Sequence, residues 1–272
     1  MKKIILLTTI FISICFGDLI SQSHELYKKG DYKNAIKNLQ KVCEKGVVEG
    51  CHNLSLIYLD KKINNSTKAK EYLQKACNAN LNISCLSLGE LYEVGVGSKK
   101  DPFKAFELYE KSCKLKSVDG CFKLGYFYEK GLATRQNFDK AEEIYKKNCD
   151  KKDIKSCLAL GGMYEKGVKK NLEKSNQYFK KACENGGVEG CLKMVVFSLN
   201  TTPPNAKNII FYLDKACNLG NDSSCMDIGV YYTKGELVEQ NLSKAKEYFG
   251  LACDMKNLKG CESYRVLNEE GF

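Results

Sequence analysis

The strongest constraint in this sequence is a series of seven cysteine pairs whose two members always stand eight residues apart. The first cysteines of consecutive pairs follow one another at intervals of 34 or 36 residues. The pairs are Cys43 and Cys51, Cys77 and Cys85, Cys113 and Cys121, Cys149 and Cys157, Cys183 and Cys191, Cys217 and Cys225, and Cys253 and Cys261. Because repetition at a period of roughly 20–50 residues marks an array of supersecondary units, we expect a repeat protein.

The residues around each pair have helical periodicity. Small and apolar residues precede the first cysteine at minus 8, minus 4 and minus 1, as at Ala69, Leu73 and Ala76. Leu, Gly and Tyr follow the second cysteine at plus 3, plus 4 and plus 7 in most repeats. Each spacing makes one face of a helix. The sequence therefore predicts two helices per repeat and an all-α fold.

A glycine ten residues after the second cysteine marks the expected end of the second helix. The glycines at this position are Gly95, Gly131, Gly167 and Gly235, and each is predicted to be a helix C-cap. Since the distance from cysteine to glycine is constant, the change of period between 34 and 36 must lie in the following loop.

Bonded cysteines at this spacing require a chain reversal between them. Residues eight apart on a straight helix are about 12 Å apart, whereas a disulfide needs Cα atoms within about 7 Å. The intervening stretches, such as ENGGVEG and NLGNDSS, carry the Gly, Asn, Asp and Ser that turns use. Each pair is therefore predicted to clamp two antiparallel helices, and closing about nine residues stabilises by about 2.6 kcal/mol in the chain-entropy model.

Zinc is the competing interpretation of the cysteines, and the sequence disfavours it. Zinc ligands commonly come in pairs about two to four residues apart, and the chain has 2 histidines, His24 and His52. Both are expected to be solvent or packing residues. We expect no metal and no other cofactor.

The N-terminus predicts export. A basic start, MKK, precedes an apolar run from Ile4 to Phe16, which is too short to span a membrane. We expect residues 1–17 to be a signal peptide cleaved before Asp18, with residues 18–272 forming a single solenoid in the periplasm or the medium. The alternative, a lipid anchor on Cys15, is disfavoured by the large Ile14 before it. Cleavage leaves 14 of the 15 cysteines, an even number.

The pattern K-A-C-x7-C-x2-L-G-x2-Y-x2-G over residues 22–270 resembles the SEL-one-like repeats, relatives of the tetratricopeptide repeats. Its disulfide version is similar to the Helicobacter cysteine-rich proteins. The resemblance implies a right-handed superhelical solenoid of αα-hairpins, a concave face built mainly from the first helix of each pair, and a C-terminal cap helix over 258–269. It also implies penicillin-like ligands, since β-lactamase activity is assigned to some members. Fold alone does not establish activity.

The sequence itself supplies little for catalysis. The S-x-x-K pattern of serine β-lactamases occurs at Ser243 to Lys246, without S-D-N or K-T-G partners. Ser243 occupies a first-turn position where other repeats have Glu or Asp, so we interpret it as a repeat residue and leave the catalytic residues unknown. EQNLS resembles an extended N-glycosylation sequon at Asn241, but a helix start is the favoured interpretation.

Positions plus 2, plus 5 and plus 9 point away from the predicted core, and they are the candidate binding positions. The polar and aromatic candidates are Asn53, Glu90, Lys123, Tyr126, Lys130, Lys193, Asn200, Asp227 and Lys234. Apolar residues at these positions include Leu56, Val196 and Val230. Such a mixed surface suits an extended protein or peptide better than one small molecule. β-Lactams or cell-wall-derived compounds are the alternative ligands.

The net charge of +10 is spread through the chain as lysine pairs. A nucleic-acid-binding protein would instead cluster its basic residues in one stripe. We therefore expect no nucleic-acid partner, no membrane contact after signal cleavage, and a monomer.

One repeat departs from the template. Cys191 is followed by Met194, Val195 and Ser198 in place of Leu, Gly and Tyr, and then by the prolines of NTTPPN at 200–205. Prolines prevent the helix from continuing. Because glycine at plus 4 permits close helix approach, we expect Val195 to push its junction open and leave a kink or a groove.

Overall fold

The computed structural model describes residues 17–167 and 170–272, and these residues contain helices, turns and loops but no strand. The predicted signal peptide lies outside the described residues except for Gly17. The chain divides into two compact units, residues 1–144 and 145–272. Both units are built from the same repeat, so the predicted all-α solenoid of helix pairs is confirmed.

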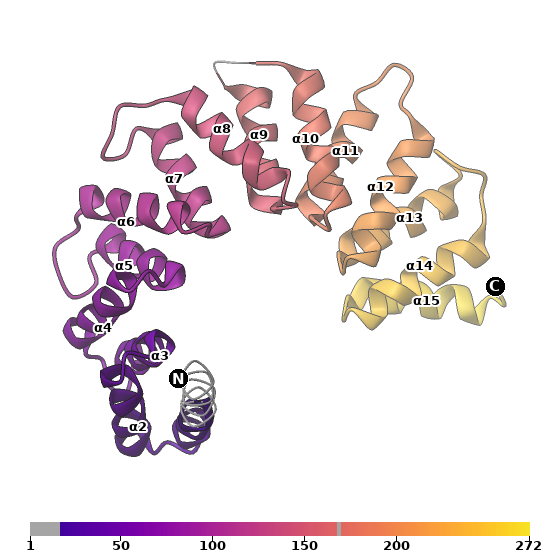
Figure 1. Ribbon diagram of the computed structural model, residues 1–272. Helices are drawn as coiled ribbons and strands as arrows, with labels where there is room; N and C mark the ends of the chain where they lie inside the picture. The colour runs from indigo at the N-terminus through magenta and orange to yellow at the C-terminus, as the bar shows by residue number, and fades with distance from the viewer. Residues whose placement is uncertain (1–16, 168–169) are drawn as a thin grey trace, which may run out of the picture. The chain divides into compact units, whose positions relative to one another are not determined.

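The described part of the first unit starts with helical residues 17–28. It continues with α2 (Tyr32–Glu44), α3 (Val48–Leu59), α4 (Ser66–Asn78), α5 (Asn82–Val94), α6 (Pro102–Lys114) and α7 (Val118–Lys130). The boundary between the units falls inside α8 (Phe138–Cys149). The rest of the second unit, labelled in Figure 1, contains α9 (Ile154–Lys166), α10 (Leu172–Glu184), α11 (Val188–Leu199), α12 (Ala206–Asn218), α13 (Asp222–Lys234), α14 (Leu242–Asp254) and α15 (Leu258–Glu269).

Each predicted cysteine pair is a disulfide that joins an even-numbered helix to the next odd-numbered helix. The Cα atoms of the seven pairs lie between 4.4 and 4.9 Å apart. The even-numbered helix ends within one or two residues of the first cysteine. The second cysteine lies in the first turn of its own helix. The disulfide clamps predicted from the spacing are therefore present.

The reversal inside each clamp depends on one left-handed residue, three positions after the first cysteine. Its amide donates to the carbonyl of that cysteine at 2.8–3.1 Å in all seven turns. The residues with positive φ at this position are Gly46, Asn80, Lys116, Lys152, Gly186, Gly220 and Lys256. A left-handed lysine is uncommon, and three of these turns contain one, so the clamp holds this conformation even without glycine.

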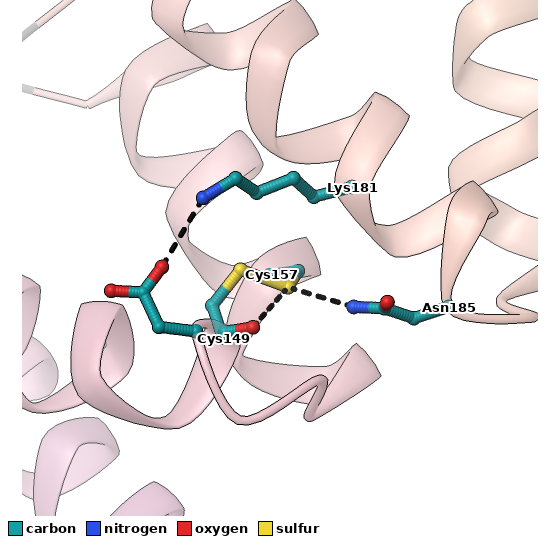
Figure 2. A network of polar contacts seen from close by, with 5 residues as sticks. Cys149, Cys157, Lys181 and Asn185 are labelled. Carbon is teal, nitrogen blue, oxygen red and sulfur yellow. Dashed lines mark hydrogen bonds and ion pairs between the residues drawn. A yellow bond between two sulfur atoms is a disulfide. The ribbon is translucent and has the colours of Figure 1, made fainter.

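Neighbouring clamps also contact each other, as Figure 2 shows for the second unit. The side-chain amide of Asn185, in the turn after Cys183, donates to the Cys157 sulfur at 3.8 Å. Lys181 pairs with Asp150 at 3.2 Å. The turn between Cys149 and Cys157 is thus held both by its own disulfide and by the next repeat.

The predicted C-cap glycines end their helices, and the loops after them take up the change of period. Gly95, Gly131 and Gly235 are C-caps with φ of 83°, 69° and 71°. Gly167 is also a C-cap, but its backbone is extended, with φ of −81°. The loop after Gly167 is the shorter kind.

Glycine at plus 4 of the odd-numbered helices allows an aromatic ring of the next even-numbered helix to lie against the backbone. A Cβ at Gly89 would stand 2.7 Å from Tyr109 Cε1, and one at Gly161 would stand 2.5 Å from Phe179 Cε1. The same relation holds in α13, where a Cβ at Gly229 would be 2.4 Å from Phe249 Cε1. No side chain fits in these places while the ring remains.

The expectation that Val195 opens its junction is wrong. The residue facing this position is Leu213, where the glycine-containing repeats have Tyr or Phe, and both Val195 and Leu213 are buried in one apolar cluster. Tyr212 is buried in the same cluster, beside the position where Ser198 replaces the template tyrosine. A larger residue on one helix is matched by a smaller one on the other, so α11 continues unbroken to Leu199.

A groove does exist at this repeat, on the side of α11 that faces α10. It has a volume of about 450 Å³, and its lining includes Met194 and Phe197 of α11 and Asn176 of α10. In the first unit the residues equivalent to Phe197 and Asn176 are Phe127 and Phe106, whose rings pack together with centroids 6.3 Å apart. The polar Asn176 gives Phe197 no such partner, which leaves the groove.

The fit between glycine and ring leads to a test by compensating substitution. We expect Gly161→Ala to destabilise the oxidised protein by about 1–3 kcal/mol, because the new methyl overpacks against Phe179. Phe179→Leu in the same chain should recover at least half of that loss. The measurement is the midpoint of urea unfolding for the single and double variants.

The neighbouring Gly162 supplies the control for this test. A Cβ there would meet nothing within 4 Å, so Gly162→Ala should stabilise α9 by about 0.5–1 kcal/mol. Equal losses for the two alanine variants, or no recovery in the double variant, would contradict the packing account.

Candidate binding face

The odd-numbered helices lie side by side within each unit, joined by side-chain contacts between consecutive repeats. In the first unit His52 Nδ1 of α3 and Ser84 Oγ of α5 share a hydrogen bond of 3.0 Å. Lys123 of α7 pairs with Glu93 of α5 at 3.0 Å. We call the surface formed by positions plus 2, plus 5 and plus 9 of these helices the odd-helix face, and we treat each unit's face by itself.

Position plus 5 is exposed on this face in both units. In the first unit Leu56 is 49% exposed and Tyr126 is 36% exposed. Glu90, the plus 5 residue of the repeat between them, is also exposed. In the second unit Val196 is 53% exposed and Val230 is 37% exposed. The structure thus places these plus 5 residues at the surface, including large apolar side chains.

Two of the predicted binding lysines, Lys123 and Lys193, also make contacts between repeats. Lys123 and the hydroxyl of Tyr109 both donate to Glu93, the hydroxyl at 2.5 Å. Burial, and then this hydrogen bond, raise the pKa of Tyr109. Lys193 of α11 contacts both carboxylate oxygens of Glu165 at 3.0 and 3.1 Å. These partly buried ammonium groups hold neighbouring odd-numbered helices together, and sequence reasoning missed that role.

The remaining predicted lysines lie at the ends of their helices. Lys130 pairs with Glu129, which raises the pKa of Lys130, and its ammonium stands 5.7 Å from the ring centre of Tyr126. Lys234 pairs with Glu236 at 3.4 Å. Asn200 is exposed at the C-cap of α11.

Asp227 occupies the same repeat position as Lys123 and Lys193, but its surroundings differ. The preceding repeat has Leu199 where the lysines find a glutamate. Partial burial on α13 raises the pKa of Asp227. Desolvation thus disfavours the charged form relative to the unfolded chain, although the side chain of Asp227 is exposed at the surface.

A cavity lies at the N-terminal end of the first unit's face. It has a volume of about 660 Å³ and is lined by residues of the helix over 17–28, by Leu39 of α2, and by Asn53, Leu56 and Ile57 of α3. Asn53 and Leu56 were predicted from the repeat template. The sequence analysis did not predict that the helix over 17–28 forms the other side of the cavity. Tyr27, Gly30 and Asp31 match the end of a template repeat, and this match could have identified that helix as part of the array.

The sequence match to a β-lactamase motif forms no catalytic arrangement. Ser243 is an exposed first-turn residue of α14. The ammonium of Lys246 is bound to the backbone carbonyl of Phe272 and lies 5.5 Å from the ring centre of Tyr264. Among the described residues no group of three or more metal-ligating side chains comes together.

The helix-start interpretation of Asn241 is confirmed. Asn241 is the N-cap of α14, and its side-chain oxygen accepts a hydrogen bond of 2.9 Å from the Lys244 amide. Asn65, Asn171 and Asn205 cap their helices in the same way. Asn241 therefore has a structural role that the repeat explains.

Comparison with known families identifies the repeat. The Sel1 repeat model matches residues 48–81, 83–117, 118–153, 154–187 and 222–257. Residues 188–221, which include the irregular repeat around Val195, lie between the fourth and fifth matches.

Solved structures share the fold. A protective antigen of uropathogenic Escherichia coli strains, which displays an SLR fold, has a TM-score of 0.69 at 21% identity and is covered over 57% of its length by 94% of this chain. A Sel1 repeat protein from Oxalobacter formigenes has a TM-score of 0.65 at 21% identity, over 86% of this chain and 99% of that protein. Cysteine-rich protein B of Helicobacter pylori is 35% identical over 48% of this chain and 95% of that protein, with a TM-score of 0.40.

The environment of Asp227 predicts a pH-dependent gain in stability when its charge is removed. The pKa of Asp227 in the folded protein is raised above the ordinary 3.8. Ionisation of Asp227 therefore does not lower the free energy of unfolding below pH 3.8, and it lowers that free energy as the pH rises through the folded pKa. Asp227→Asn should therefore raise the thermal midpoint at pH 7, and the gain should vanish near pH 3. Thermal unfolding of both proteins between pH 3 and 8 measures it.

The exposed Asp254 at the end of α14 gives the control for removing one negative charge. A gain of the same size in Asp254→Asn, or a gain that persists near pH 3, would show that burial of Asp227 is not the cause.

Proposed function

We propose that this chain, which belongs to the Sel1 repeat family, is an exported scaffold that binds an extended segment of a protein or peptide along the odd-helix face. The host or the cell envelope would supply the partner. A repeat array suits this task because successive repeats present similar positions along one extended surface.

The observation that carries the proposal is the contrast between the packed and the exposed positions of the repeat. Plus 3 and plus 4 are buried in both units, as at Leu88 and Gly89. Plus 5 is exposed and changes from Leu56 to Glu90 to Tyr126 along the first unit. Exposed side chains that vary from repeat to repeat along one face are available for recognition of an extended partner.

The compartment follows from the disulfides. Seven disulfides indicate an oxidising, extracytoplasmic environment. Signal cleavage before Asp18 and release into the periplasm or the medium belong to the proposal, supported by the apolar run after MKK. Among the described helices none is long and apolar enough to cross a membrane. The Escherichia coli structure is described as a protective antigen, a description that suits an exported protein met by a host.

β-Lactam hydrolysis, the alternative that the resemblance implied, receives no support from the described side chains. Hydrolysis needs a nucleophile or activated water beside a base and an oxyanion donor. Lys246 is engaged with the C-terminal residue, and His52 is bonded to Ser84 with a pKa lowered by burial. We therefore propose a binding protein.

Export and full oxidation predict a defined mass for the purified protein. The exported chain should begin at Asp18 and be 14 hydrogen atoms lighter than its reduced form, two for each of the seven disulfides. Intact mass spectrometry before and after reduction measures both quantities. Retention of residues 1–17, or a lipid on Cys15, would contradict this part of the proposal.

Photocrosslinking in the native cell tests the binding face. With benzoylphenylalanine in place of Tyr126 we expect discrete crosslinked species, because this side chain would contact the partner. The same replacement at Phe103 is the matched control, since Phe103 is 67% exposed but lies on α6. We expect at least tenfold less product there.

Two outcomes would contradict the proposed function. One is crosslinking from position 103 as strong as from position 126. The other is nitrocefin turnover above about 1 s⁻¹, the low end of typical enzymes, that is abolished by Ser243→Ala.

A further inference from the structure

The cavity at the N-terminal end of the first unit has the size of a ligand site. Its volume of about 660 Å³ falls within the roughly 300–1,000 Å³ of known ligand pockets. Leu39 and Ile57 form a buried apolar floor. Ile20 and His24 approach from the helix over 17–28, and Asn53 and Leu56 from α3.

The repeat itself does not require this cavity. In α5 the plus 3 and plus 4 positions are Leu88, which is 1% exposed, and Gly89, against which the ring of Tyr109 lies. Counted back from Gly30, the helix over 17–28 has Ser23 and His24 at these two positions. Ser23 is smaller than the template leucine, and both Ser23 and His24 line the cavity.

The charge of the lining selects the ligand. Among the described residues that line the cavity there is no lysine or arginine. The carboxylate among them, Glu25, is exposed and pairs with Lys28 at 3.3 Å. An anion would find no cation inside, and burying an unpaired charge is costly. An uncharged apolar group is therefore favoured, and the carboxylate of a β-lactam is disfavoured.

Asn53 supplies a polar contact at the mouth of the cavity. Its carboxamide offers both a donor and an acceptor, which matches the donor and acceptor of a peptide backbone. Asn53 and Leu56 are also plus 2 and plus 5 residues of α3, so the cavity is continuous with the odd-helix face of the first unit. A chain lying along that face can place one side chain in the cavity.

We propose that this cavity is the anchor for an uncharged apolar side chain of the bound polypeptide, whose backbone hydrogen-bonds to Asn53. The inference rests on the proposed function and adds to it the chemical class of the anchoring residue. The partner segment carries Leu, Ile, Val or Phe at the anchor position, with no acidic residue beside it.

Methyl NMR on the oxidised, exported protein tests the anchor with defined probes. The probes are the capped peptides acetyl-Ala-Leu-Ala-amide and acetyl-Ala-Asp-Ala-amide, and benzylpenicillin. We expect the leucine peptide to shift the methyl signals of Ile20 and Ile57 saturably, while the buried Ile228 of the second unit stays unchanged. Neither anionic probe should shift them.

Three variants assign the contacts. Leu56→Asp should weaken the leucine peptide at least tenfold, because it adds a carboxylate to an apolar wall. Asn53→Ala should weaken it about two- to tenfold, the worth of one hydrogen bond. Asn200→Ala removes an exposed asparagine of the second unit and should leave the affinity unchanged.

Each contrary outcome overturns the anchor without deciding the function as a whole. Absence of saturable shifts at Ile20 and Ile57 would overturn it, as would an equal response to the aspartate peptide or to benzylpenicillin. If the Tyr126 crosslinks persist in that case, only the anchor is lost. If position 126 gives no crosslinked product but the leucine peptide still shifts the methyl signals of Ile20 and Ile57, the cavity binds apolar groups for a purpose other than the proposed scaffold role.

Discussion

The clamp between an even-numbered helix and the next odd-numbered helix is the constraint on which the rest of the structure depends. It fixes where the first helix ends, the left-handed residue that reverses the chain, and the register of the second helix. Lys116, Lys152 and Lys256 take this conformation without the freedom of glycine. Because each bridge closes only about nine residues, its stabilisation of about 2.6 kcal/mol is local, and the protein is held together as a chain of separately secured hairpins.

Between hairpins, one pair of positions sets how closely the repeats approach. Glycine at plus 4 goes with a ring at minus 4 of the next repeat, as at Gly89 with Tyr109 and Gly161 with Phe179. A larger residue goes with leucine instead. The leucine pairs are His24 with Leu39, Ser55 with Leu73, and Val195 with Leu213. A larger residue at plus 4 is thus accompanied by a smaller one at minus 4, which reduces the overpacking that a ring would cause there.

Sequence reasoning succeeded wherever the information was local to one repeat. Helix periodicity, the cysteine spacing and the terminal glycines each depend on residues within about ten positions, and the helices, clamps and C-caps follow from them. It failed where two repeats contribute to one contact. Val195 could not be judged without Leu213, and Lys123 could not be recognised as structural without Glu93, 30 residues earlier. The N-terminal cavity was missed because the helix over 17–28 has no cysteine pair to align it.

Position plus 2 shows how such an array can acquire function without losing its fold. Lys123 and Lys193 use it to join repeats, each through a glutamate at plus 8 of the preceding repeat. Where that glutamate is absent, the same position does not make this ion pair between repeats. Asp227 is one such position, because the preceding repeat has Leu199 in place of the glutamate. Asn53 is another, and it lines the N-terminal cavity opposite the helix over 17–28, which contains no cysteine. The clamps keep both hairpins folded whatever residue stands there, so these positions are the ones that a partner can select.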